Sequence, residues 1–144
     1  MKKGGVIHDD SRIKDIYRNI KSVAIIGLSS NPAKDSHKVG EYLQKQGYKI
    51  YPVHPKADRI LGEKAFKSLD DLTAELKEPV DVVDVFRKPE QIVPHAEEAV
   101  RHGPKIFWMQ LGIENENAAQ ILTDAGIDVV MNHCMKQEHE KYFN

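Results

Sequence analysis

The sequence contains a single cysteine, Cys134, among its 144 residues. One cysteine excludes an internal disulfide and fits a reducing compartment, so we expect a cytoplasmic protein. No stretch approaches the roughly 20 apolar residues that a membrane-spanning helix needs. The N-terminal segment MKKGGVIHDDSR carries charge but lacks the apolar core of a signal peptide. We therefore expect no membrane partner.

The chain also lacks an excess of charge of either sign. Lys and Arg number 21 and Asp and Glu number 22, which gives a formal net charge of -1. This balance argues against a nucleic acid partner, since such proteins carry basic surfaces for the phosphates. The length suits one folded unit, and no internal repeat or linker divides it. We expect residues 1–144 to form a single domain.

Five short apolar runs alternate with segments that have helical signals. The runs cover residues 22–28, 48–53, 80–86, 105–111 and 126–131. Near-continuous apolar runs of this length are typical of strands buried on both faces of a sheet. Helices are predicted over residues 11–20, 36–46, 68–76, 89–101 and 115–125.

This alternation predicts one Rossmann-like α/β domain with a five-stranded parallel sheet and helices on both faces. Counting the strands along the chain, we expect the order 3-2-1-4-5. Such sheets bind ligands beyond the carboxyl ends of their strands, where the winding direction reverses. The places to search for chemistry are therefore the loops 27–36, 54–59, 87–89, 110–114 and 132–136.

The first of these loops lacks the glycines of the familiar nucleotide motifs. Gly27 ends the first strand, but Ser29 stands where G-x-G-x-x-G has its second glycine, and Pro32 stands near the place of the third. Ser29, Ser30 and Ser36 offer hydroxyls beside a predicted helix N-terminus, which favours a phosphate. The alternative is a polar connection that only caps the helix.

The second loop lacks the acid that a dinucleotide site uses to hold ribose hydroxyls. The second strand instead ends with Val53, His54 and Pro55, and Lys56 follows. A base suits a phosphorylated ribose, because the phosphate charge pairs with a cation. Pro52 and Pro55 favour an extended edge for a purine. The alternative for Lys56 is a solvated surface lysine.

The third strand ends with an aromatic residue and two bases, Phe86, Arg87 and Lys88. The ring of Phe86 could flank a flat base, and the two cations favour an anion. Two alternatives stay open: Phe86 belongs to the core, and Arg87 pairs with a carboxylate such as Asp84.

Polar groups near the last two strand ends have less specific patterns. Gln110 could hydrogen-bond a ligand amide, and Gly112 allows a close approach of the backbone. Cys134 and its neighbouring histidines have no second cluster at zinc spacing, so we expect no metal site. No orienting residue is evident, so we expect no catalytic residue. The expected role of Cys134 is that of a buried structural thiol beside a capping Asn132.

Four segments together carry a family resemblance: VAIIGLSSNPAKDSHKVGEYL, YPVHPKADRILGEKAFKSL, DVVDVFRKPEQIVPHAEEAV and IFWMQLGIENENAAQILTDAGIDVVMNHCMKQEH. In this combination the chain resembles the small stand-alone CoA-binding proteins of the Rossmann-like CoA-binding domain family. That family is related to the N-terminal domain of the succinyl-CoA synthetase alpha subunit.

The resemblance implies that coenzyme A, free or as acyl-CoA, is the ligand and lies across the strand ends. The implied binding residues are Gly27, Ser29, Ser30, Pro32, Ser36, Val53, Pro55, Lys56, Phe86, Arg87, Lys88, Gln110 and Gly112. Those of the first loop would hold the pyrophosphate and those of the second the adenosine. Phe86, Arg87 and Lys88 would border the nucleotide. Gln110 and Gly112 would line the rest of the pocket.

The resemblance also limits the expected activity. The related ligase needs a further domain with a phosphorylated histidine, for which we expect no room in this chain. We therefore expect binding of coenzyme A without catalysis, with an acyl-CoA enzyme as an unidentified partner. Two alternatives stay open: a small NADP-dependent oxidoreductase, and a redox protein in which Cys134 forms a mixed disulfide with coenzyme A.

Overall fold

The computed structural model describes residues 3–144 as one α/β domain, which confirms the expected fold class. Met1 and Lys2, part of the domain expected over residues 1–144, lie outside the described residues. Five parallel strands form the sheet: β1 (Ser22–Ile26), β2 (Lys49–Val53), β5 (Val82–Val85), β6 (Ile106–Met109) and β7 (Asp128–Val130). A separate antiparallel hairpin joins two short strands, β3 (Arg59–Ile60) and β4 (Glu63–Lys64).

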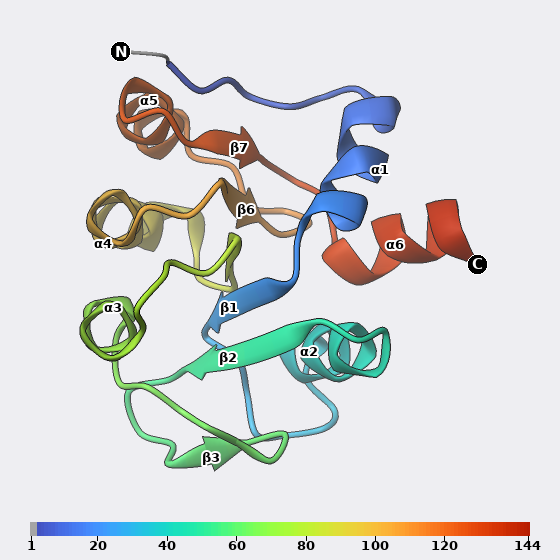
Figure 1. Cartoon of the computed structure of the whole chain (residues 1–144), viewed down its shortest axis with the longest axis vertical. Coiled ribbons are helices and arrows are strands. Elements are labelled where there is room, and N and C mark those ends of the chain that lie inside the picture. Colours follow the sequence, from blue (N-terminus) through green and yellow to red (C-terminus); the bar gives the residue numbers. More distant parts are fainter. Residues whose placement is uncertain (1–2) are drawn as a thin grey trace.

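Helices cover both faces of the sheet, as Figure 1 shows. One face carries α3 (Leu69–Glu75), α4 (Ile92–His102) and α5 (Glu116–Asp124), and the other carries α1 (Asp10–Asn19), α2 (Asp35–Lys45) and α6 (Met135–Phe143). A single 3-10 turn, η1 (Pro89–Gln91), precedes α4. Each face of the sheet has its own apolar cluster, so the sheet lies between two cores.

The expected strand order was wrong. Counted along the chain, the sheet has the order 2-1-3-4-5, because β5 pairs with β1 on the side opposite to β2. The physical reason is burial: every residue of β5 is buried, whereas β2 has one exposed and one half-buried position and contains Pro52. A proline has no N–H for a strand ladder and therefore suits an edge strand. The fully buried strand belongs in the centre.

Extended segments of the chain cover both edge strands of the sheet. Beside β2, the Phe66 N–H donates to the Pro52 carbonyl at 2.9 Å, and the His54 N–H donates to the Phe66 carbonyl at 2.8 Å. Beside β7, the Ile7 N–H donates to the Val129 carbonyl at 2.7 Å. The carboxyl-terminal end of β2 and the middle of β7 are thus paired on their outer sides within the chain.

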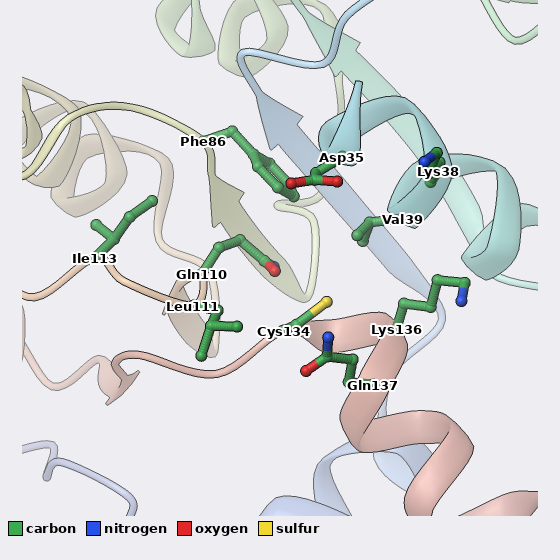
Figure 2. Close-up of a pocket in the computed structure, with 10 residues that line it drawn as sticks. All are labelled: Asp35, Lys38, Val39, Phe86, Gln110, Leu111, Ile113, Cys134, Lys136 and Gln137. Atoms are coloured by element: carbon green, nitrogen blue, oxygen red, sulfur yellow. The ribbon is translucent and has the colours of Figure 1, made fainter. Parts of the chain in front are cut away.

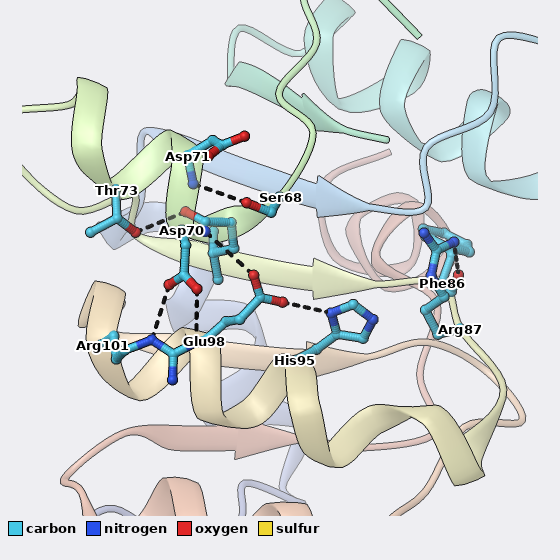
Figure 3. Close-up of polar contacts among 10 residues, drawn as sticks. Ser68, Asp70, Asp71, Thr73, Phe86, Arg87, His95, Glu98 and Arg101 are labelled. Atoms are coloured by element: carbon cyan, nitrogen blue, oxygen red, sulfur yellow. Dashed lines mark hydrogen bonds and ion pairs between the residues drawn. The ribbon is translucent and has the colours of Figure 1, made fainter. Parts of the chain in front are cut away.

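Polar contacts join α3 to α4 on one face of the sheet (Figure 3). Arg101 donates two hydrogen bonds to the Asp70 carboxylate, at 3.0 and 2.8 Å. Glu98 accepts from the Asp70 N–H at 3.4 Å and contacts the His95 ring at 3.0 Å. Exposed ion pairs contribute little individually, so this network orients two helices whose apolar residues already hold them to the sheet.

The last helix, α6, was not among the predicted helices. The Tyr17 hydroxyl donates to the Met135 carbonyl at 2.8 Å, and the Trp108 indole donates to the His133 carbonyl at 2.8 Å. The Tyr42 hydroxyl and the buried His139 ring lie 2.7 Å apart. These contacts hold α6 against α1 and α2 at the carboxyl edge of the sheet.

Candidate functional site

The winding of the sheet reverses between β1 and β5. The chain leaves β1 towards β2 on one side and returns to β5 on the other, and both crossovers start at the carboxyl edge. A crevice is expected there in an open α/β sheet. With the observed order, the reversal falls at the ends of β1 and β5, beside Gly27 and the segment at Phe86 and Arg87. The expected order would have placed it between the first and fourth strands.

Gly27 permits a close approach of two strand ends. Its φ is +84°, a conformation that favours glycine. A Cβ at this position would lie 2.5 Å from Nη1 of Arg87 and also too close to the Phe86 carbonyl oxygen. The Gly27 N–H donates to the Val53 carbonyl at 2.9 Å. One glycine therefore brings the ends of β1, β2 and β5 together.

The loop that follows Gly27 is folded by its own side chains. The Ser29 N–H donates to Oγ of the buried Ser36 at 2.9 Å, and the His37 ring lies 2.8 Å from the Ser29 carbonyl oxygen. Oγ of Ser29 accepts from the Asn31 N–H at 3.0 Å. Several groups that we expected to face a phosphate thus hold the loop in shape, while the neighbouring Ser30 and Pro32 are exposed.

The start of α2 has no side-chain cap. Helix α2 begins at Asp35, and its N-cap residue is Lys34, which makes no side-chain capping hydrogen bond. The first N–H groups of a helix have no partner within the helix. This end of α2 therefore offers amide donors at the carboxyl edge of the sheet, although the Asp35 carboxylate beside them opposes an anion.

Basic side chains gather at the ends of β2 and β5. The pKa of His54 is lowered, and burial of its ring is the largest cause. The positive charges of Arg87, Lys56 and Lys67 nearby lower it further. These four residues are called the basic cluster below. Lys56 and Lys67 are exposed, and Arg87 is half-buried. Sequence reasoning missed Lys67, because it follows β4 and only the fold brings it to this edge.

Arg87 has no carboxylate partner within residues 3–144. Its guanidinium donates to the Phe86 carbonyl at 3.4 Å (Figure 3). The same group lies against Gly27. The alternative pairing with Asp84 does not occur, because Asp84 is fully buried in β5 and accepts from Nε2 of Gln110. An unpaired guanidinium at the crevice is available for an anion from outside the chain.

A cleft of about 300 Å³ lies between the N-terminal ends of α2 and α6 (Figure 2). It is called the α2–α6 cleft below. Its lining residues are Asp35, Lys38, Val39, Phe86, Gln110, Leu111, Ile113, Cys134, Lys136 and Gln137. A more open groove of about 420 Å³ lies nearby, lined by Phe86, Arg87, Lys88, Pro89, Gln91 and Ile113. Because Phe86 and Ile113 line both, the two hollows are neighbours.

The structure brings together only part of the expected set. Phe86 and Gln110 line the cleft, and Phe86 with the bases after it lines the groove. The side chain of Val53 is buried in the core, and Pro55 is exposed. Gly112 lines neither hollow, and its N–H donates to the Asn132 side chain at 2.6 Å.

Other lining residues of the cleft were missed by sequence reasoning. Asp35, Lys38 and Val39 all lie in the first turns of α2, whose start had been expected near the site. Lys136 and Gln137 lie in the first turn of α6. The three-residue and four-residue spacing on α2 was the available signal, since such residues share a helix face. Nothing in the pattern placed α6 opposite α2.

Cys134 lies on the wall of the cleft and is half-buried. Burial raises the pKa of its thiol, although the backbone N–H groups of Gln137 and Lys136 act against this. A raised pKa makes a thiol a weaker nucleophile at neutral pH. Cys134 itself is the N-cap residue of α6, whereas Asn132 binds Gly112 instead of capping that helix. Within residues 3–144, no group of three or more metal-ligating side chains forms.

A comparison with known protein families identifies the family of the region that contains the basic cluster and the α2–α6 cleft. The model of the CoA-binding domain matches residues 21–140. The chain belongs to this family. The matched region of this CoA-binding domain runs from just before β1 into α6 and includes the crevice, the basic cluster and the α2–α6 cleft.

Relatives of this CoA-binding domain include both small proteins and large enzymes. Over 129 residues, the chain is 41% identical to the uncharacterized protein YneT of Bacillus subtilis, covering 90% of this chain and 93% of YneT. A solved structure of a hypothetical protein from Pyrococcus horikoshii is 34% identical, with a TM-score of 0.87, covering 95% of this chain and 94% of that one. This chain and the Pyrococcus protein thus share the fold over nearly the whole length of both.

An ADP-forming acetate–CoA ligase of Methanocaldococcus jannaschii is 38% identical over 86 residues. These residues make up 59% of this chain but only 12% of the ligase. The match therefore leaves most of the ligase uncovered. The comparisons do not support either alternative function. Within residues 3–144, no helix is long and apolar enough to cross a membrane.

Proposed function

We propose that this chain, over residues 1–144, is a non-catalytic binding domain for coenzyme A or an acyl-CoA. The observation that carries the proposal is the unpaired Arg87 guanidinium against Gly27, at the point where the winding of the sheet reverses. The family to which the chain belongs supports the identity of the ligand.

The distribution of charge supports one direction for the bound ligand. The three cations of the basic cluster, Arg87, Lys56 and Lys67, gather near the ends of β2 and β5 and suit the 3′-phosphate and pyrophosphate of coenzyme A. The α2–α6 cleft has apolar walls at Val39, Phe86 and Leu111. We place the nucleotide at the basic cluster and the pantetheine arm past Phe86 in the cleft.

The proposal is tested by calorimetry with coenzyme A and 3′-dephospho-CoA. Lys56 is exposed, so Lys56→Ala should weaken binding of coenzyme A about threefold to fivefold and change dephospho-CoA binding less. Arg87→Leu should cost about tenfold or more, because the half-buried guanidinium makes stronger charge-assisted contacts. Lys45→Ala is the control, since Lys45 lies at the far end of α2 and pairs with Glu41.

Equal affinity of the wild type for the two ligands would contradict the role of the basic cluster. Absence of saturable binding to either would contradict the proposed function itself. Native mass spectrometry of freshly purified protein provides a second measurement, because a retained coenzyme A would be identified by its mass.

A further inference from the structure

Asp84 is a carboxyl group in the middle of the central strand β5. It is fully buried, and its Oδ2 atom has no hydrogen-bond partner within residues 3–144. Burial raises its pKa to about 8, so the neutral acid predominates at pH 7. Its neighbours on the strand are all valines. A buried polar atom without a partner costs stability, so packing alone gives no reason for an acid at this position.

The one side chain that binds Asp84 belongs to the α2–α6 cleft. Nε2 of Gln110 donates to Oδ1 of Asp84, and Oε1 of Gln110 accepts from the Met135 N–H at 3.3 Å. Gln110 is 3% exposed, yet it lines the cleft, and Figure 2 shows its amide directed into it. Both ends of the amide are therefore fixed, one by the central strand and one by the start of α6.

A fixed amide presents a defined hydrogen-bonding pattern. A glutamine has two N–H donors and two acceptor lone pairs, and the two internal contacts use one of each. One N–H and one lone pair remain. The Met135 N–H needs an acceptor and so keeps the oxygen end of the amide at α6, while Oδ1 of Asp84 holds the nitrogen end, and the free N–H therefore keeps one position. A donor held in this way suits a carbonyl oxygen.

We infer that Asp84 is a positioning residue for ligand binding, which orients Gln110 to bind a carbonyl of an amide- or thioester-bearing arm in the α2–α6 cleft. This inference rests on the proposed function and adds to it the group that the cleft recognises. Asp84 itself does not contact the ligand, since it is fully buried beneath Gln110.

The test compares coenzyme A with adenosine 3′,5′-diphosphate, which carries phosphates but no arm. Asp84→Leu removes the anchor of Gln110 and should weaken coenzyme A binding by about fivefold to tenfold, the effect of one hydrogen bond. Binding of adenosine 3′,5′-diphosphate should stay within about twofold. Asp84→Asn keeps an acceptor for Gln110 and should restore coenzyme A binding to within about twofold.

Two further measurements separate positioning from folding. The double variant Asp84→Leu/Gln110→Leu removes both partners of the buried contact and should unfold at no lower temperature than Asp84→Leu, which leaves Nε2 of Gln110 without its acceptor. Gln110→Leu should produce the same loss of coenzyme A affinity, and the double variant should lose no more than either single one, since both act through one contact.

Several outcomes would overturn the inference. Unchanged coenzyme A affinity in Asp84→Leu would show that the acid does not orient the cleft. Equal losses for both ligands would show a general effect on the fold. If the wild type binds the diphosphate as tightly as coenzyme A, the cleft does not bind the arm. If it binds neither ligand, the proposed function fails and this inference fails with it.

Discussion

Gly27 combines a positive φ with a close contact that leaves no room for a side chain. Its φ is positive, and a side chain there would collide with the Phe86 carbonyl and with Arg87. Gly47 has a φ of +98° but open space around it. The two glycines therefore form a matched pair, in which strain acts alone at one position and together with a clash at the other.

We expect Gly47→Ala to lower the free energy of unfolding by about 1–2 kcal/mol, the cost of a left-handed residue. Gly27→Ala should lower it further and should also weaken coenzyme A binding, because the guanidinium of Arg87 must move. Urea unfolding and calorimetry measure the two effects. Equal stability and unchanged binding in the two variants would show that the contact with Arg87 is unimportant.

The buried carboxyl of Asp84 makes stability depend on pH. Its pKa rises from an ordinary value of 3.8 to about 8 in the folded protein. Between these values the unfolded chain has lost the proton and the folded chain keeps it. The contribution of Asp84 to stability should therefore fall with rising pH, by up to about 1.4 kcal/mol per pH unit.

The check is the difference in unfolding free energy between Asp84→Asn and the wild type, measured between about pH 5 and pH 7.5. Asparagine does not titrate, so this difference should grow in favour of the variant as the pH rises. Other titrating groups affect both proteins equally and cancel. A difference that stays constant with pH would show that the carboxyl is not protonated in the folded state.

Part of the site was predictable from single residues. Lys56 stands where a dinucleotide site would have an acid, and Phe86 is followed by the basic residues Arg87 and Lys88. Both patterns indicated the edge of the sheet where the basic cluster lies. The α2–α6 cleft was not predictable in this way. Its walls depend on α6 docking opposite α2 through contacts such as Tyr42 with His139, which are 97 residues apart.

At the scale of the elements, His102 joins α4 to the segments around it. Its Nε2 accepts from the Val80 N–H at 2.8 Å, so its proton is on Nδ1, which lies 2.7 Å from Oγ1 of Thr73. That hydroxyl in turn donates to the Leu69 carbonyl at 2.8 Å. Protonation of the ring would break the contact with Val80, and burial lowers the pKa of His102.

We expect the wild type to lose stability as the pH falls below about 6.5, because the unfolded imidazole takes up a proton that the folded one resists. His102→Gln should show a smaller loss between pH 7 and pH 5, measured by urea unfolding. His8→Gln, in the N-terminal segment, should behave like the wild type. Parallel pH profiles of His102→Gln and the wild type would exclude this role.

Most elements were predictable because their patterns are local. The apolar runs located all five strands, and the helices predicted over residues 68–76 and 115–125 begin at Ser68 and Asn115, which are the N-cap residues of α3 and α5. The order of the strands depends on contacts between distant segments, which a local pattern does not reveal. We therefore expected the fourth strand beside the first, where the structure has β5, the third strand along the chain. Pro52 was the overlooked signal, since it favours an edge position for β2. The hairpin β3–β4 was missed because its strands have only two residues each.

At the scale of the whole molecule, a bound ligand should stabilise the fold. Coenzyme A at a hundredfold excess over its dissociation constant adds about 2.7 kcal/mol to the free energy of unfolding. For a domain of this size, that corresponds to a rise in melting temperature of about 5–10 °C. Thermal unfolding with coenzyme A and dephospho-CoA at equal concentrations should give the smaller rise for dephospho-CoA. Equal rises would contradict the assignment of the 3′-phosphate.

The segments that run beside β2 and β7 also affect how copies of the molecule can meet. Fibrils and open-ended aggregates grow when an unpaired edge strand forms backbone hydrogen bonds with a strand of another copy. Here the segment around Phe66 pairs with the carboxyl-terminal end of β2, and the segment around Ile7 pairs with β7. The N-terminal segment therefore occupies the outer side of β7, and its loss would expose an edge along which the sheet could be extended.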